Sequence, residues 1–224
     1  MKLLTLCVTA LLLSIAVHSQ VQFGILGGLQ ATSANYTIGG KKQKTSYKPG
    51  IQLGANFKIP IEGNLSFAPE LFYSMKGYKV KYNLYMYPPD PTAIDNNTTF
   101  HNIELAFPLQ YDFGKGDNHW FFRAGPSLDF QFFGREEFNT NADEKMKRNI
   151  PFGYDKYGHY SANLLLHLGY EMSNGFFIFG QYTNGVANIS NKDEGPQIKH
   201  RAFGITVGKF IRKSKIVLDT RNRE

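Results

Sequence analysis

The residues of this sequence that could do chemistry are mostly ionisable side chains at alternate positions of short apolar segments. Acids and bases at such spacing can form ion pairs if a narrow protein interior brings them together. Buried charges are costly unless they are paired and hydrogen-bonded, so interlocking pairs are the arrangement to expect. The predicted interior polar network comprises Lys58, Glu70, Lys76, Glu104, Asp112, Arg123, Asp129, His167 and Glu171.

Catalytic motifs are missing from the sequence: it contains no H-E-x-x-H, Walker or G-x-S-x-G pattern, and its histidines lack metal-ligand spacing. His167 and Glu171 would lie about 13 Å apart along a strand, too far to touch. We therefore predict no enzymatic activity, no cofactor and no metal site. The alternative is a small membrane hydrolase or acyltransferase whose rim residues would be Asp129, Arg135, Glu136 and His159.

A segment rich in tyrosine and proline, residues 83–99, contains the candidate recognition residues Tyr85 and Tyr87. Exposed aromatic rings on a proline-stiffened loop suit binding of sugars or proteins. The alternative is a loop that only covers the mouth of the fold. Residues 134–158 carry charges of both signs and are expected to form a solvated segment, with a helical face as one option.

The segments that carry these ionisable residues alternate between apolar and polar positions with a period of two residues. Odd positions from Ile103 to Phe113 are apolar or aromatic, whereas even positions from Asn102 to Asp112 are mostly polar or small. This alternation predicts β-strands with one apolar face. In the segment 161–171, Leu165 is an exception, because it is an apolar residue at a position that the alternation assigns to the polar face. Similar segments occur near residues 21–31, 51–59, 65–76, 102–113, 120–132, 161–171, 175–189 and 199–211, which makes eight candidate strands.

The connections between these strands alternate in length. Short ones at 60–64, 114–118 and 173–175 separate long ones near 32–49, 78–99, 134–158 and 188–199. Outer-membrane barrels have short periplasmic turns and longer extracellular loops. The expected fold is therefore all-β, an eight-stranded antiparallel up-and-down transmembrane β-barrel. A soluble lipocalin-like barrel that turns its apolar faces inward around an apolar ligand is the alternative.

Composition agrees with an exported barrel. Hydrophobic content of 42% and 22 glycines exclude a disordered chain, and a mean hydropathy of −0.33 is too polar for a bundle of membrane helices. Residues 1–19 resemble a cleaved signal peptide, with Lys2 before an apolar run and Val17-His18-Ser19 before the cut. Cys7 lies in that run, so the mature chain has no cysteine. The barrel would span 20–211 and a charged tail 212–224.

The net charge of +7 bears on partners. An exported protein rarely meets nucleic acid, so outer-membrane lipid and surface glycans or a protein partner are expected instead; solvated loop charge is the alternative. A monomer is expected. Basic residues gather at Lys41, Lys42, Lys44, Lys48, Arg212, Lys213, Lys215, Arg221 and Arg223.

Several segments also resemble the PorT-type outer-membrane β-barrel family of Bacteroidetes. The best match is the run from Leu65 to Gly77, with its Pro-Glu-Leu-x-Tyr-Ser core; Phe23 to Leu29 and Ile103 to Leu109 are similar to other family segments. The resemblance implies an eight-stranded barrel in the outer membrane. The sequence departs from the family at Lys209, where an aromatic residue is expected, and in the charged tail.

Overall fold

The computed structural model describes residues 21–83, 92–114 and 116–211, so the predicted signal peptide, the charged tail, Tyr85 and Tyr87 lie outside it. Within these ranges the secondary structure consists of β-strands alone. No helix in the described residues is long and apolar enough to cross a membrane. The strands are β1 (Gln22–Ile38), β2 (Lys41–Lys42), β3 (Lys44–Ser46), β4 (Lys48–Glu62), β5 (Leu65–Phe67), β6 (Glu70–Lys81), β7 (Asp95–Ala106), β8 (Leu109–Phe113), β9 (His119–Asn139), β10 (Lys145–Asn149), β11 (Tyr160–Glu171), β12 (Phe176–Gly185) and β13 (Gln197–Ile211).

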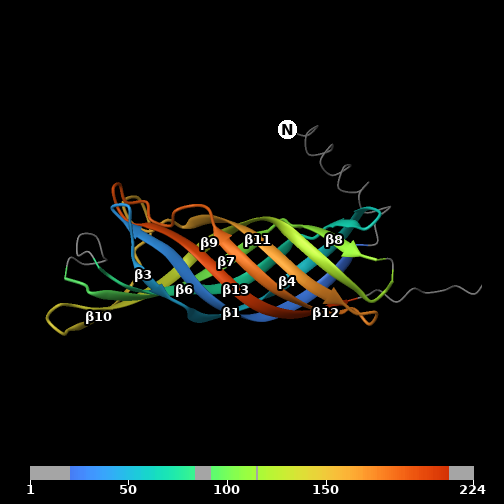
Figure 1. The fold of residues 1–224 in the computed structure, drawn as a ribbon, viewed down its shortest axis with the longest axis horizontal. Helices are drawn as coiled ribbons and strands as arrows, with labels where there is room; N and C mark the ends of the chain where they lie inside the picture. The colour runs from blue at the N-terminus through green and yellow to red at the C-terminus, as the bar shows by residue number, and fades with distance from the viewer. Residues whose placement is uncertain (1–20, 84–91, 115, 212–224) are drawn as a thin grey trace, which may run out of the picture.

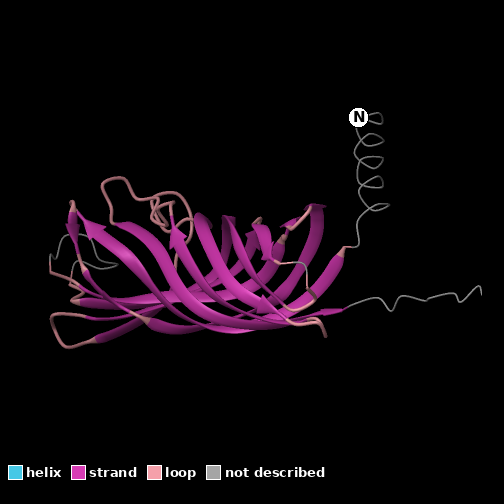
Figure 2. Cartoon of the chain, turned by 45° about the vertical axis from the view of Figure 1, so that its right-hand side comes forward, coloured by secondary structure: helices cyan, strands magenta, loops and turns pink. Residues whose placement is uncertain are grey.

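The sheet closes on itself as an antiparallel barrel. The last long strand pairs with the first, from Phe23 opposite Ile211 to Thr37 opposite Gln197. The other pairings run in chain order through β4, β6, β7, β9, β11, β12 and β13. The strands run obliquely along the long axis (Figure 1), and loops are confined to the two ends (Figure 2). Closure matters because it leaves no unpaired sheet edge.

Eight barrel strands account for the longer elements, as the alternation predicts. β5 and β6 together form the third strand, and β7 and β8 form the fourth. Pro69 and Pro108 stand at the two breaks, where each lacks an N–H to donate. Their carbonyls still serve the ladder, since Pro69 accepts from the N–H of Phe57 and Pro108 from that of Ala68. β2, β3 and β10 belong to hairpins beyond the barrel wall.

The outer face of the barrel carries an apolar belt. Leu29 is 71% exposed and Leu53 is 68% exposed. The neighbouring residues that point into the barrel, such as Gln52, are polar and buried. A soluble barrel would turn these faces the other way, so the lipocalin-like alternative is wrong. The belt includes Ile25, Leu29, Leu53, Leu71, Leu105, Phe122, Leu128, Leu164, Leu168, Ile178, Ile205 and Val207.

Towards the end of the barrel that carries the long hairpins, the inner face of the sheet becomes apolar and the outer face becomes polar. On β6 the inward residues change from Ser74 and Lys76 to Tyr78 and Val80, while the outward residues become Lys79 and Lys81. Such an apolar interior with a polar exterior is the pattern of a sheet in water. The strands therefore extend beyond the lipid belt as a water-exposed segment with its own core. We call this segment the extension.

The extension corrects three expected loops. Residues 32–49, 78–99 and 134–158 contain long strand ends, since β1 runs to Ile38, β6 to Lys81 and β9 to Asn139. The helical option for 134–158 is also wrong, because β10 lies there and pairs with β9, with Lys147 opposite Glu137. The lengths of these strands were underestimated because the apolar residues move from the outer to the inner face while the hydrogen bonding between the strands continues. The seventh strand, expected to reach 189, ends at Gly185.

Candidate functional site

The interior ion pairs form layers, and the first lies at the middle of the barrel. Lys76 Nζ is 2.6 Å from Glu104 Oε2 and 2.9 Å from both carboxylate oxygens of Asp129. All three side chains are at most 2% exposed. Ser127 donates to Glu104 and Asn163 donates to Asp129, so both acids have further hydrogen bonds. Two carboxylates around one ammonium leave a local formal charge of −1.

Arg123 forms a second layer nearer the short turns. Its Nη1 lies 2.6 Å from Glu70 Oε1, and its Nε donates to Gln110 Oε1 at 2.6 Å. His167 Nδ1 is 3.8 Å from the same Glu70 oxygen, and its ring stacks on Phe179 at 4.4 Å. The guanidinium also lies over buried phenylalanine rings, a cation–π arrangement that holds it in place. These rings belong to Phe121, Phe177 and Phe179.

A third layer lies at the short-turn end. Lys58 Nζ is 2.8 Å from Asp112 Oδ2 and 2.8 Å from Glu171 Oε2. His119 Nε2 lies 3.4 Å from Asp112 and 3.5 Å from Glu171. Asp112 is 16% exposed, so this layer is nearer to solvent than the other two. No group of three or more potential metal ligands is found among the described residues.

All nine residues predicted for the interior network point into the barrel, and each lies within 4 Å of an oppositely charged or ionisable member. The register explains this: Lys76, Glu104 and Asp129 occupy inward positions of β6, β7 and β9, and Glu104 is directly opposite Asp129. The side chains of the two inner layers are almost fully buried, so they fill the barrel interior at these levels.

The four rim residues of the enzyme alternative do not converge. Asp129 and Glu136 are seven residues apart on β9, roughly 23 Å along the strand. Arg135 is exposed and faces outward, whereas its neighbour Glu136 is buried and bonds to Arg148 and Asn96. His159 Nδ1 donates to the backbone carbonyl oxygen of Gln131 at 2.8 Å, and its ring stacks on Phe152.

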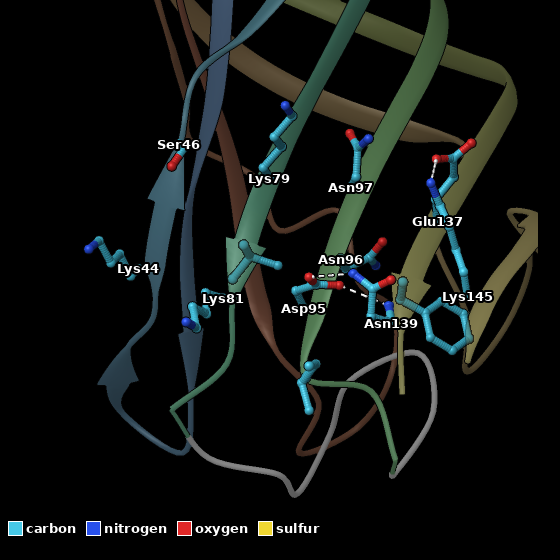
Figure 3. Close-up of a pocket in the computed structure, with 13 residues that line it drawn as sticks. Lys44, Ser46, Lys79, Lys81, Asp95, Asn96, Asn97, Glu137, Asn139 and Lys145 are labelled. Carbon is cyan, nitrogen blue, oxygen red and sulfur yellow. Dashed lines mark hydrogen bonds and ion pairs between the residues drawn. The ribbon is translucent and has the colours of Figure 1, made fainter. Parts of the chain in front are cut away.

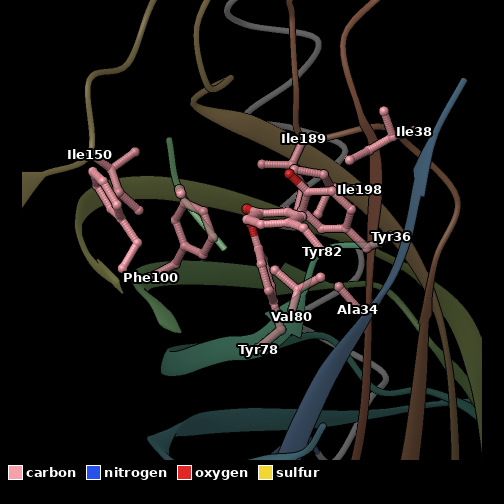
Figure 4. Packing of buried hydrophobic residues seen from close by; sticks show 12 residues of the cluster. Ala34, Tyr36, Ile38, Tyr78, Val80, Tyr82, Phe100, Ile150, Ile189 and Ile198 are labelled. Atoms are coloured by element: carbon pink, nitrogen blue, oxygen red, sulfur yellow. The ribbon is translucent and has the colours of Figure 1, made fainter. Parts of the chain in front are cut away.

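An aromatic cluster fills the extension (Figure 4). Tyr36 contacts Tyr78 and Tyr82 edge-on at ring-centre distances of 5.7 and 5.8 Å. Burial raises the pKa of Tyr82 well above its usual value. The cluster closes the inside of the barrel above the ion pairs. Its members are Ala34, Tyr36, Ile38, Tyr78, Val80, Tyr82, Ala93, Phe100, Phe138, Ile150, Ile189 and Ile198.

A polar groove of about 460 Å³ lies on the extension, between β3, β6, β7 and β9 (Figure 3). Its charged lining consists of four lysines and two carboxylates: Lys44, Lys79, Lys81, Lys145, Asp95 and Glu137. We call it the basic groove. Of these residues only Lys44 belonged to a basic cluster recognised in the sequence, because the others come from three segments that only strand pairing brings together.

Two other features escaped sequence reasoning. The inward aromatic cluster of Phe121, Phe177, Phe179 and Phe210 sits on faces expected to be polar. The sequence signal was present as consecutive phenylalanines, Phe121-Phe122 and Phe176-Phe177, which place one ring on each face. Leu165, the noted exception, packs inside against Phe72 and Ala106.

A closed antiparallel sheet with an apolar belt outside and paired charges inside defines an integral β-barrel of the outer-membrane type. The family model described as "Outer membrane protein beta-barrel domain" matches residues 15–191, and the chain belongs to this family. None of the curated proteins compared with the chain matches it.

Several solved barrels are similar in fold. OprG from Pseudomonas aeruginosa is 13% identical, with 88% of this chain and 98% of OprG covered and a TM-score of 0.47. Ail of Yersinia pestis, in complex with the heparin analogue sucrose octasulfate, is 11% identical, with 85% and 98% covered and a TM-score of 0.44. Neisserial surface protein A is 13% identical, with 84% and 96% covered and a TM-score of 0.43.

Proposed function

We propose that this chain is a non-enzymatic, non-conducting barrel whose role is interaction at the cell surface through its extension. The observation that carries the proposal is the exchange of faces along the strands. On the side of the short turns, apolar side chains face lipid. In the extension, lysines and asparagines face water around a packed aromatic core. Strands that continue into water with their own core form a stiff platform rather than mobile loops.

The orientation follows from the connections. Short turns such as Ser173–Gly175 lie at one end, and the extension and its hairpins lie at the other. Since outer-membrane barrels have short periplasmic turns and longer extracellular loops, this arrangement supports an extension outside the cell. The proposal also includes export by a signal peptide that is cleaved after residue 19. It further includes a monomeric state and membership of the PorT-type subgroup. Surface glycans or proteins of acidic character are the partner class that a net charge of +7 favours.

Absence of catalysis is supported by the geometry of the polar residues. The buried acids are bound by lysine, arginine and amide donors. Asp129, Arg135, Glu136 and His159 lie on different faces or levels, so they cannot surround one substrate atom. The tightly buried ion pairs also argue against a pore, because ions would have to displace them.

The test combines topology with conductance. An epitope inserted in the β9–β10 turn at Asp143 should be labelled on intact cells, whereas the same epitope at Gly175 should be labelled only after permeabilisation. The purified barrel should show a heat-dependent shift in gel mobility and no stepwise current in planar bilayers. Surface labelling at Gly175, or regular conductance steps, would contradict the proposal. Cells that produce the barrel should also bind an array of acidic glycans or proteins better than cells that lack it.

A further inference from the structure

We propose that the basic groove binds the phosphate groups of an anionic glycolipid in the outer leaflet of the same membrane. This inference rests on the proposed placement of the extension outside the cell, and it assigns a ligand class to one site on it. The site consists of the side chains of Lys44, Lys79 and Lys81, with Lys48 at its margin. Lysine ammonium groups bind phosphate as point charges with several donors.

Strand pairing concentrates positive charge on one wall of the groove. Lys44 on β3 is directly opposite Lys81 on β6, and Lys79 lies two residues away on the same face. Like charges directly opposite on neighbouring strands repel and destabilise the pair. An anion bound between them would relieve this repulsion. Among the described residues, no carboxylate lies within ion-pair distance of Lys44, Lys79 or Lys81.

The acids of the groove already have other partners. Asp95 is the cross-strand neighbour of Lys81, but its carboxylate accepts the N–H and the side-chain amide of Asn139 at 2.9 and 2.8 Å. Glu137 pairs with Lys147 at 3.0 Å and with Lys145 at 3.6 Å. The opposite wall is therefore close to neutral, and the β3–β6 wall retains its positive charge.

Lys48 adds a fourth cation at the margin. Its ammonium donates to Asn97 Oδ1 at 2.7 Å, and Asn97 lines the groove. The stem of Lys48 passes over Gly77, where a Cβ would lie 3.2 Å from Lys48 Cδ. The amide group of Asn97 and the hydroxyl group of Ser46 also line the groove and supply neutral hydrogen-bonding groups for sugar hydroxyls.

The level of the groove identifies lipid as the occupant. Lys79 lies four residues beyond Met75, the last apolar outward side chain of β6. Four residues span about 13 Å along a strand, or about 10 Å along the membrane normal at the usual tilt. This is the level of the head groups that flank the hydrocarbon core. The lysines also face outward from the barrel flank, towards neighbouring lipids, whereas a partner from another cell would first meet the hairpin tips.

The test measures binding of purified lipopolysaccharide by the folded full-length barrel in zwitterionic detergent, alongside the same glycolipid after enzymatic removal of its phosphates. The site variant is Lys44→Gln/Lys79→Gln/Lys81→Gln. The matched control is Lys156→Gln/Lys192→Gln/Lys199→Gln, which removes three charges from the same end of the molecule outside the groove. The heat-dependent mobility shift of each sample verifies that it is folded.

The wild-type barrel and the control should bind the phosphorylated glycolipid alike, and the site variant should bind it on the order of tenfold to a hundredfold more weakly. Removal of the phosphates should weaken wild-type binding by a similar factor. Equal binding by the site variant, equal losses in both variants, or indifference to the phosphates would overturn the proposal. So would competition by a soluble sulfated polysaccharide without binding of the glycolipid, which would indicate a partner in trans. Surface labelling at Asp143 tests the proposed function separately, because it does not depend on these lysines.

Discussion

The ammonium group of Lys76 lies 2.9 Å from each carboxylate oxygen of Asp129, at the centre of the barrel and fully shielded from solvent. The two residues are 53 positions apart in the chain and sit on strands that are not adjacent, with β7 between them. The pair therefore links two strands of the barrel wall that are not hydrogen-bonded to each other at this level. Glu104, on the intervening strand, completes the cluster.

Replacement of Lys76 by methionine should lower the free energy of unfolding by about 3–5 kcal/mol, because it leaves Asp129 and Glu104 buried without their cation. Urea unfolding of the barrel in lipid vesicles measures the change. The triple variant Lys76→Met/Glu104→Leu/Asp129→Leu should recover most of the loss, since it removes the unpaired charges as well. A single variant as stable as the wild type would show that the cluster does not support the fold.

Gly54 marks a position where two strands approach too closely for a side chain. A Cβ there would overlap Phe72 Cβ and the carbonyl oxygen of Leu71, and neither can move without shifting the backbone. Gly54→Ala should therefore cost about 1–3 kcal/mol of unfolding free energy in vesicles. Gly180→Ala is the matched control, because its nearest neighbour would be the Leu168 carbonyl at 4.0 Å. Equal stability of the two variants would argue against the register between β4 and β6.

Trp120 is the single tryptophan, it is 56% exposed on the outer face, and it stacks edge-on with Tyr170. Its position near the short-turn end of β9 places it in the interfacial aromatic girdle. Its fluorescence should be quenched by brominated lipids, most strongly when the bromine lies near the head groups, and only weakly by aqueous iodide. Strong iodide quenching with no effect of brominated lipid would contradict a lipid-facing belt.

Tyr82 should remain a neutral phenol in alkali for as long as the extension is folded. Burial raises its pKa in the folded state, whereas an unfolded tyrosine ionises near pH 10. Its contribution to stability is therefore fully present below about pH 10 and is lost as the pH rises above that value. Absorbance at 295 nm measures the ionised tyrosines, and Tyr82→Phe should leave the titration of the folded protein unchanged near pH 10.

In denaturant Tyr82→Phe should lose one titrating group relative to the wild type, and this loss is the control for the measurement. Loss of amplitude in the folded Tyr82→Phe protein near pH 10 would mean that the aromatic cluster is open to water.

The lipid-facing part of the fold could be predicted because its signal is local. Odd and even residues from Asn102 to Phe113 fall on opposite faces of any strand, and the structure confirms the eight strands and their antiparallel order. The same parity placed Lys76, Glu104 and Asp129 together on inward positions. The alternation could not predict which of these charged residues form ion pairs, because the pairs depend on the register between strands.

The extension was missed for a related reason. Tyr36 and Tyr78 point inward and Lys79 points outward, which reverses the earlier rule of apolar outside and polar inside. A strand that continues from lipid into water must make this reversal. In the sequence, the reversal looks like the end of the apolar–polar alternation, and hence like the end of the strand.

The two-residue repeat of the extended chain was sufficient to predict the strand period, the number of barrel strands and, within the lipid belt, the face on which most residues lie. Only the folded sheet shows where the apolar face stops meeting lipid, which charges pair in the interior, and how Lys44, Lys79, Lys81 and Glu137 come together in one groove. Those features depend on the register of strands far apart in the chain, and register is fixed only when the whole sheet closes.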